Sequence, residues 1–167
     1  RYVKMKLSNN FTLAELTKSQ TAVRRGIRNE PSTDHINNLI HLAKTILQPV
    51  REHFGKPVTI SSGYRSPELC EAIGSSAKSQ HAKGEAADFE IHGVDNKDLA
   101  TWIADNCEFD QLILEFYKKG EPNSGWVHCS YSRNQNRNQS LIAYREDGKV
   151  LKGPNYKPPN LTDLLND

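Results

Sequence analysis

The stretch Ser79-Gln80-His81-Ala82-Lys83-Gly84-Glu85-Ala86-Ala87-Asp88 contains a histidine and a carboxylate with a glycine and small alanines between them. On one helix the two side chains would lie about 10 Å apart, too far to share a metal ion that binds its ligands at about 2 Å. The chain must therefore turn back between His81 and Asp88. Gly84 permits this turn, because glycine adopts backbone conformations that other residues avoid.

A second histidine, His128, lies far along the chain in Gly125-Trp126-Val127-His128-Cys129-Ser130. Two imidazoles and one carboxylate are a common ligand set for a catalytic zinc ion, which keeps a fourth position for water. We therefore predict that His81, Asp88 and His128 hold one zinc ion. The pattern alone leaves open a simple surface ion pair between His81 and Asp88. His92 is excluded as a ligand, because four residues along a strand separate it from Asp88 by roughly 13 Å.

The chain has 167 residues, a length that fits a single domain with its own core. We expect residues 1–167 to form one domain, with 1–10 and 153–167 as extended termini. The net charge of +2 argues against nucleic-acid binding, and the two arginines of the loop 133–137 are expected to be solvated. No apolar run approaches the length that spans a bilayer. No feature indicates an oligomer, so a monomer is the default.

The first half of the chain is predicted to be mostly helical. Thr12 and Glu15 have the spacing of a capping box before a short helix, whereas 17–28 is expected to be irregular. Apolar residues then recur at steps of three and four up to Phe54, which predicts one long helix that ends at Gly55.

Strand patterns dominate the second half. The predicted strands cover 56–63, 88–92, 109–117 and 126–131, and Asp147-Gly148 indicates a hairpin between 141–145 and 150–151. Short helices are expected after Pro67 and after Asp95. Helices followed by a mostly antiparallel sheet predict the α+β class. The three cysteines lack metal-type spacing, so we expect three free thiols.

The stretch from Ser79 to Asp88 resembles the Ser-x-His-x-x-Gly-x-Ala-x-Asp motif of the M15 peptidases, which are zinc D-alanyl-D-alanine carboxypeptidases, dipeptidases and phage endolysins. Ser62-Gly63-Tyr64-Arg65-Ser66 resembles the arginine motif of this family, and Trp126-Val127-His128 resembles its last ligand motif. The resemblance runs from about Val58 to Tyr131. It implies a hedgehog/DD-peptidase-like fold with helices on one face of the sheet, the same three zinc ligands, and a cell-wall peptide as substrate.

One departure concerns the catalytic base. Many members of the family carry a glutamate three positions before the last histidine, where this chain has Gly125. We predict that Glu115 replaces it. A simple hairpin that pairs Tyr117 with Trp126 would place Glu115 opposite His128 on the same face of the sheet.

Two other carboxylates are rivals for this role. Glu90 shares the predicted strand face of Asp88, and Glu85 lies within the first motif. Glu115 stays our first choice, because the subgroup that this chain most resembles holds its glutamate on that strand.

Four further residues are candidates for contact with the substrate. Arg65 is expected to stabilise negative charge on the scissile carbonyl oxygen, or to bind a substrate carboxylate. Ser79, Tyr64 and Trp126 are expected to line the cleft, with the core as the alternative place for the aromatics and a turn cap as the alternative role of Ser79.

These features favour a zinc peptidase that cuts peptidoglycan stem peptides, as a D-Ala-D-Ala carboxypeptidase or an L-alanyl endopeptidase. The start of the chain lacks the apolar segment of a secretory signal. We therefore expect synthesis in the cytoplasm and action at the bacterial cell wall, as in a phage or prophage lysis enzyme. Gly125 keeps one alternative open: an inactive, zinc-stabilised binding module in a phage particle or a wall-binding complex.

Overall fold

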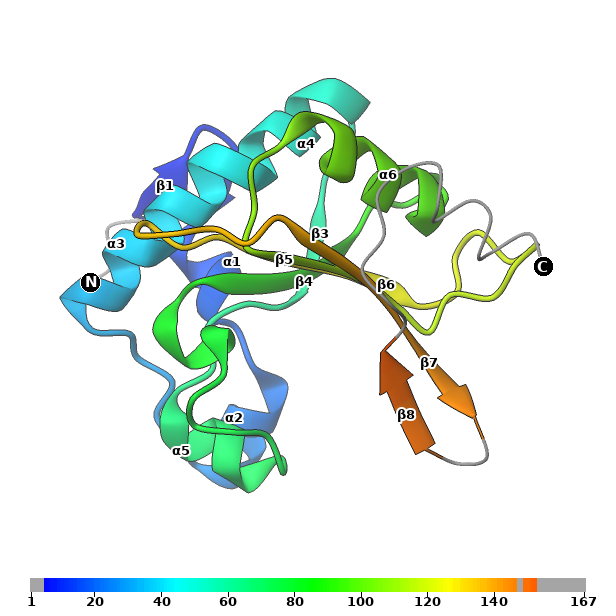
Figure 1. Cartoon of the computed structure of the whole chain (residues 1–167). Coiled ribbons are helices and arrows are strands. Elements are labelled where there is room, and N and C mark those ends of the chain that lie inside the picture. The colour runs from blue at the N-terminus through cyan, green and yellow to red at the C-terminus, as the bar shows by residue number, and fades with distance from the viewer. Residues whose placement is uncertain (1–4, 147–148, 153–167) are drawn as a thin grey trace.

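The computed structural model of the chain describes residues 5–146 and 149–152 (Figure 1). The helices are α1 (Leu13–Thr17), α2 (Gln20–Arg25), α3 (Thr33–Leu42), the π-helical turn η1 (Ala43–Leu47), α4 (Gln48–Phe54), α5 (Pro67–Ala72), the 3-10 turn η2 (Gln80–Lys83) and α6 (Asn96–Asn106). The strands are β1 (Lys6–Ser8), β2 (Phe11–Thr12), β3 (Thr59–Ser62), β4 (Ala86–Glu90), β5 (Gln111–Glu115), β6 (Trp126–Ser130), β7 (Gln139–Glu146) and β8 (Lys149–Lys152). The predicted tail at 153–167 lies outside the described residues.

The main sheet has six strands in the order β3-β4-β6-β5-β7-β8. Its neighbours are antiparallel except for β5 and β7, which run parallel. The helices α3, α4 and α6 lie along one side of this sheet (Figure 1). The predicted α+β class with a mostly antiparallel sheet is therefore confirmed. None of the helices among the described residues is long and apolar enough to cross a bilayer.

Both ends of the described chain form strand pairs. At the N-terminal end, β1 lies within the expected extension 1–10 and pairs with β2, which lies just after it. At the other end β7 and β8 form the predicted hairpin, in which Glu146 pairs with Lys149. The turn residues Asp147-Gly148 themselves lie outside the described part of the chain.

The predicted long helix is present as α3, η1 and α4 in succession. The Ser32 side chain caps its start, and Gly55, with a left-handed φ of 65°, ends it as predicted. The π-helical turn was not predicted. It precedes Pro49, whose ring would crowd the carbonyl group of Thr45 in a regular helix and which has no N–H to donate.

The segment 17–28 contains the helix α2, so the prediction that it is irregular is wrong. Ser19 accepts a hydrogen bond from the backbone N–H of Ala22 and thereby caps the helix, and Gly26 ends it. Ala22 is the only buried residue of α2. A six-residue helix with one buried position has no apolar period for a sequence pattern to reveal.

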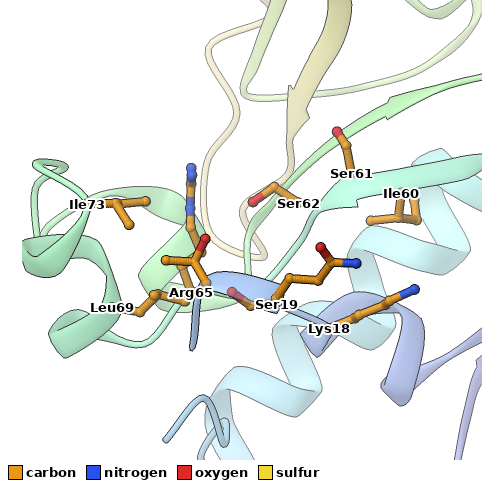
Figure 2. Close-up of a pocket in the computed structure, with 10 residues that line it drawn as sticks. Lys18, Ser19, Ile60, Ser61, Ser62, Arg65, Leu69 and Ile73 are labelled. Atoms are coloured by element: carbon orange, nitrogen blue, oxygen red, sulfur yellow. The ribbon is translucent and has the colours of Figure 1, made fainter. Parts of the chain in front are cut away.

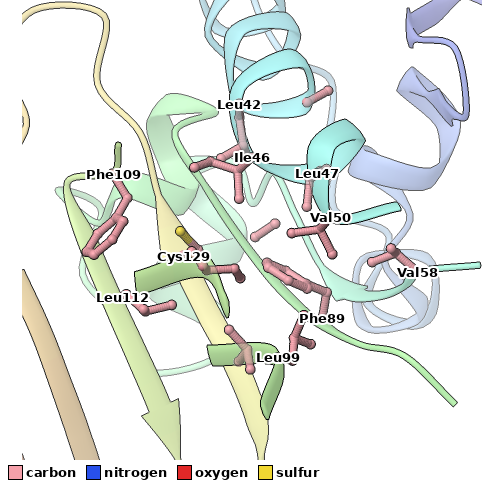
Figure 3. Close-up of a cluster of buried hydrophobic side chains, with 14 of the residues drawn as sticks. Leu42, Ile46, Leu47, Val50, Val58, Phe89, Leu99, Phe109, Leu112 and Cys129 are labelled. Carbon is pink, nitrogen blue, oxygen red and sulfur yellow. The ribbon is translucent and has the colours of Figure 1, made fainter. Parts of the chain in front are cut away.

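The helix-covered face of the sheet carries the main core (Figure 3). Phe89 of β4 and Val127 and Cys129 of β6 are fully buried there. Because successive strand residues point to opposite faces, the residues between them point to the other side of the sheet. The three cysteines are free thiols, as predicted.

Candidate metal centre

A tight turn presents His81. Ser79 accepts a hydrogen bond from the backbone N–H of His81 and so caps η2, and Gly84 ends η2 with a φ of 74°. A Cβ atom at position 84 would collide with the backbone oxygen of His35, so the site requires glycine for space as well as for conformation. The chain turns back between His81 and Asp88, as the motif predicts.

The ring of His81 is held in one orientation. Its Nδ1 lies 2.7 Å from the carbonyl oxygen of Gly63, which can only accept a hydrogen bond. Nδ1 therefore carries the proton, and the lone pair of Nε2 is directed toward Asp88, whose Oδ1 lies 3.5 Å away. This is the arrangement by which a metal-binding histidine is usually oriented, with the second ring nitrogen bound to a carbonyl group.

Asp88 and His128 come from neighbouring strands. β4 and β6 pair with these two residues directly opposite each other, and Nδ1 of His128 lies 2.8 Å from Oδ1 of Asp88. One ligand atom from each of His81, Asp88 and His128 lies within 4.8 Å of the others. Two imidazole nitrogens and one carboxylate oxygen at this spacing fit the ligand set of a catalytic zinc site. His92 is exposed and lies outside this group.

The protonation states favour metal binding. Burial alone would raise the pKa of Asp88, but the hydrogen bond from His128 and the contact with His81 outweigh it and hold the pKa well below its usual range. Burial lowers the pKa of His81 and prevails over the opposite effect of Asp88. At neutral pH the aspartate is therefore charged and His81 is uncharged, which are the forms that bind a metal ion.

Glu115 lies on the same face as the ligands, although in a different register from the one predicted. β5 pairs with β6 so that Ile113 lies opposite His128 and Glu115 lies opposite Trp126. The predicted pairing of Glu115 with His128 is therefore wrong by two residues. Since side chains alternate with a period of two, a shift of two residues keeps Glu115 on the face of His128.

The backbone explains the shifted register. Phe116 has a φ of 56°, so β5 ends at Glu115 and the connection to β6 is longer than a simple hairpin. Gly125 has a φ of 65°, and a Cβ atom there would collide with the backbone oxygen of Glu115. No glutamate side chain can be accommodated at position 125. Glu115 of the neighbouring strand β5 lines the same cavity as His81, Asp88 and His128.

The three ligands line a cavity of about 500 Å³, and Arg65, Ser79, Glu115 and Trp126 line it with them. Within the described part of the chain, Nε of Arg65 and Nε1 of Trp126 are buried and have no hydrogen-bond partner. Buried donors are normally paired. Both nitrogens belong to residues that line this cavity, and no protein group among the described residues accepts a hydrogen bond from them.

Tyr64 and the rival carboxylates do not line this cavity. Tyr64 is 3% exposed and packs against His35, with ring centroids 5.4 Å apart, so its predicted contact with substrate is wrong. Glu90 accepts a hydrogen bond from the side chain of Asn96. Glu85 lines a separate cavity.

One cluster beside the site was missed at the level of sequence. The buried carboxylate of Asp110 accepts two hydrogen bonds from the Arg137 guanidinium, both at 2.9 Å, and one from the side chain of Gln80 at 2.9 Å. Gln80 directly precedes His81, so the cluster connects the ligand turn to the start of β5. The partners are about thirty residues apart in the chain, and no local pattern joins them.

A comparison with protein families agrees with this geometry. The family model described as Peptidase M15 matches residues 9–130, a range that contains the three candidate ligands and Glu115. No curated protein matches the chain at a significant level.

Proposed function

Because the chain belongs to the peptidase M15 family, we propose that it is a zinc peptidase that hydrolyses the stem peptides of bacterial peptidoglycan. The observation that supports this most strongly is the convergence of His81, Asp88 and His128 within 4.8 Å at a cavity that Glu115 also lines. A metal ligand set beside a carboxylate is the arrangement that a hydrolytic zinc site requires.

In this proposal His81 binds zinc through Nε2, and Asp88 and His128 complete the protein ligands. When bound, zinc supplies Lewis acidity and lowers the pKa of water in the site toward neutrality. Glu115 acts as the general base: it accepts a proton from the attacking water and then donates it to the leaving amine.

Two side chains act on the substrate. Arg65 stabilises the negative charge that develops on the scissile carbonyl oxygen, or binds a carboxylate of the substrate through paired hydrogen bonds. Trp126 donates from Nε1 to a peptide carbonyl group, which would satisfy its buried and unpaired nitrogen. Ser79 contacts the substrate from the turn that it caps.

The choice of the cleaved bond and of the biological role rests on the family resemblance. We propose cleavage either between the two D-alanines of the stem peptide or at an L-alanyl bond, by a monomer that acts at the cell wall as a phage or prophage lysis enzyme. The chain 1–167 would form one domain with this activity.

The direct test is mass spectrometry of muropeptides that have been incubated with the chain, with and without a chelator. We expect shortened stem peptides in the first sample and none in the second, and restored cleavage when zinc is added back. Unchanged muropeptides in the presence of zinc would contradict the proposal.

The alternative is an inactive, zinc-stabilised binding module. It predicts binding to peptidoglycan without a cleared zone on a peptidoglycan gel, whereas the peptidase produces a cleared zone. Gly125 would favour this alternative if the cavity had no other carboxylate to act as a base. Because Glu115 lines the cavity, we prefer the peptidase.

A further inference from the structure

Figure 2 shows a second cavity, which shares Arg65 with the metal cavity. It has a volume of about 430 Å³ and is formed by the connection between α1 and α2, by β3, and by α5. Arg65 lines this cavity and the metal cavity, so the two adjoin at its side chain. We name it the Lys18 cavity, after the second cationic residue in its wall.

The charged groups of the Lys18 cavity have one sign. Lys18 and Arg65 line it from different elements, and no aspartate or glutamate lines it within the described residues. Two cations, with no anionic residue among the described residues of the wall, favour a negatively charged ligand.

The remaining wall suits an amino-acid residue. Hydroxyl groups of Ser19 and Ser62 lie between Arg65 and Lys18 in the view of Figure 2, and can bind polar groups. Ile60 and Leu69 add apolar surface against which a short carbon chain can pack. A volume of this size holds one or two residues of a peptide that extends from the metal cavity.

We propose that the Lys18 cavity is a subsite of the substrate cleft for a peptide residue that carries a free carboxylate. The enzyme would then discriminate against a wall peptide in which this carboxylate is converted to a carboxamide. The inference rests on the proposed function, because it assumes that a peptide lies across the metal cavity. Beyond that function, it states that the Lys18 cavity selects a free carboxylate and that Lys18 is a specificity residue.

The test uses the zinc-loaded chain and three synthetic stem pentapeptides, L-Ala-γ-D-Glu-L-Lys-D-Ala-D-Ala. One has both carboxylates free, one has the D-Glu carboxylate amidated, and one has the C-terminus amidated. Amidation at the residue that enters the subsite should raise KM about 10-fold and leave kcat within about 2-fold, since a charge-assisted hydrogen bond is lost.

Lys18→Glu supplies the decisive comparison. Because Lys18 is exposed, we expect KM for the free peptide to rise only about 3- to 10-fold, and KM for the sensitive amide to stay unchanged. The ratio of KM for the amidated peptide to KM for the free peptide should therefore fall toward one. The matched control is Lys44→Glu, which makes the same charge change at an exposed residue of η1 that lines neither cavity.

Equal effects of Lys18→Glu on free and amidated peptides, or the same ratios as in Lys44→Glu, would overturn the subsite. If no peptide is hydrolysed, the proposed function fails by itself. Calorimetric titration of the same three peptides into wild type, Lys18→Glu and Lys44→Glu still decides the subsite in that case. A preference for the free carboxylate that only Lys18→Glu reduces would support it, and equal affinities would contradict it.

Discussion

The two faces of strands β4 and β6 carry opposite chemistry. On the helix-covered face, Phe89, Val127 and Cys129 are fully buried in the core. On the other face, Asp88 and His128 contact each other beside an open cavity. Within the five residues of each strand, side chains thus alternate between the stabilising core and the candidate active site.

This difference separates two classes of substitution. A change on the core face should lower the stability of the fold and leave the chemistry of the folded molecules intact. A change on the site face should abolish the chemistry and leave the fold intact. The following substitutions test that separation, from the largest expected effect to the smallest.

Glu115→Gln is expected to have the largest effect. Loss of a general base should lower kcat by about 10²- to 10⁴-fold, while zinc content and the denaturation midpoint remain those of the wild type. The measurement is steady-state hydrolysis of a stem peptide with zinc analysis of the same sample. Glu90→Gln is the matched control and should keep its activity; normal turnover in Glu115→Gln would assign the base to another carboxylate.

Phe89→Ala tests the core face. Truncation of a fully buried phenylalanine should lower the free energy of unfolding by about 3–5 kcal/mol, measured by urea denaturation. Val23→Ala removes apolar atoms from a residue that is 82% exposed and should change stability by less than about 0.5 kcal/mol. Similar losses of unfolding free energy in both variants would mean that Phe89 does not lie in the buried core.

Gly125→Ala tests the connection that brings Glu115 into the site. It combines a left-handed backbone with a collision against the backbone of Glu115, and should cost about 3 kcal/mol of stability and reduce activity. Gly120→Ala has a comparable φ of 85° but open space around its Cβ position, so it should cost only about 1 kcal/mol. Equal costs would show that the close approach of the two chain segments is absent.

Asp110→Asn should have the smallest effect, visible in the pH dependence of stability. The hydrogen bond from Arg137 holds the pKa of Asp110 below its usual value. The stabilisation is therefore complete above a pH of about 5 and is lost as the pH falls through the lowered pKa. Arg137 is half exposed, so the loss should be about 1 kcal/mol.

The comparison is between thermal midpoints of wild type and Asp110→Asn from about pH 7 down to about pH 1.5, below the lowered pKa. The two curves should differ at neutral pH and converge in acid. A constant difference across this range would mean that Asp110 does not contribute through its charge.

The sequence predicted the features that depend on local spacing. The turn at Gly84, the alternation around His128 and the end of the long helix at Gly55 follow from neighbouring residues, and the structure contains all of them. The strand face of Glu115 was also predicted, although its register was not. A shift of the β5–β6 pairing by an even number of residues leaves Glu115 on the same face of the sheet. The pairing itself depends on the left-handed conformations of Phe116 and Gly125.

Two features that depend on distant contacts were not predicted: the burial of Tyr64 and the cluster around Asp110. Tyr64 lies between a strand and a helix, where no period distinguishes a buried side chain from one that faces a cleft. The cluster of Asp110, Arg137 and Gln80 joins three separate segments of the chain. Such partners become neighbours only through the order of the strands in the sheet.

The central claim is that His81, Asp88 and His128 together bind one zinc ion. The most direct test is zinc stoichiometry by atomic absorption for the wild type, His128→Ala and the control His41→Ala, which alters an exposed histidine outside the group. We predict one zinc ion per chain in the wild type and the control, and a strongly reduced content in His128→Ala. A full complement of zinc in His128→Ala would contradict the claim.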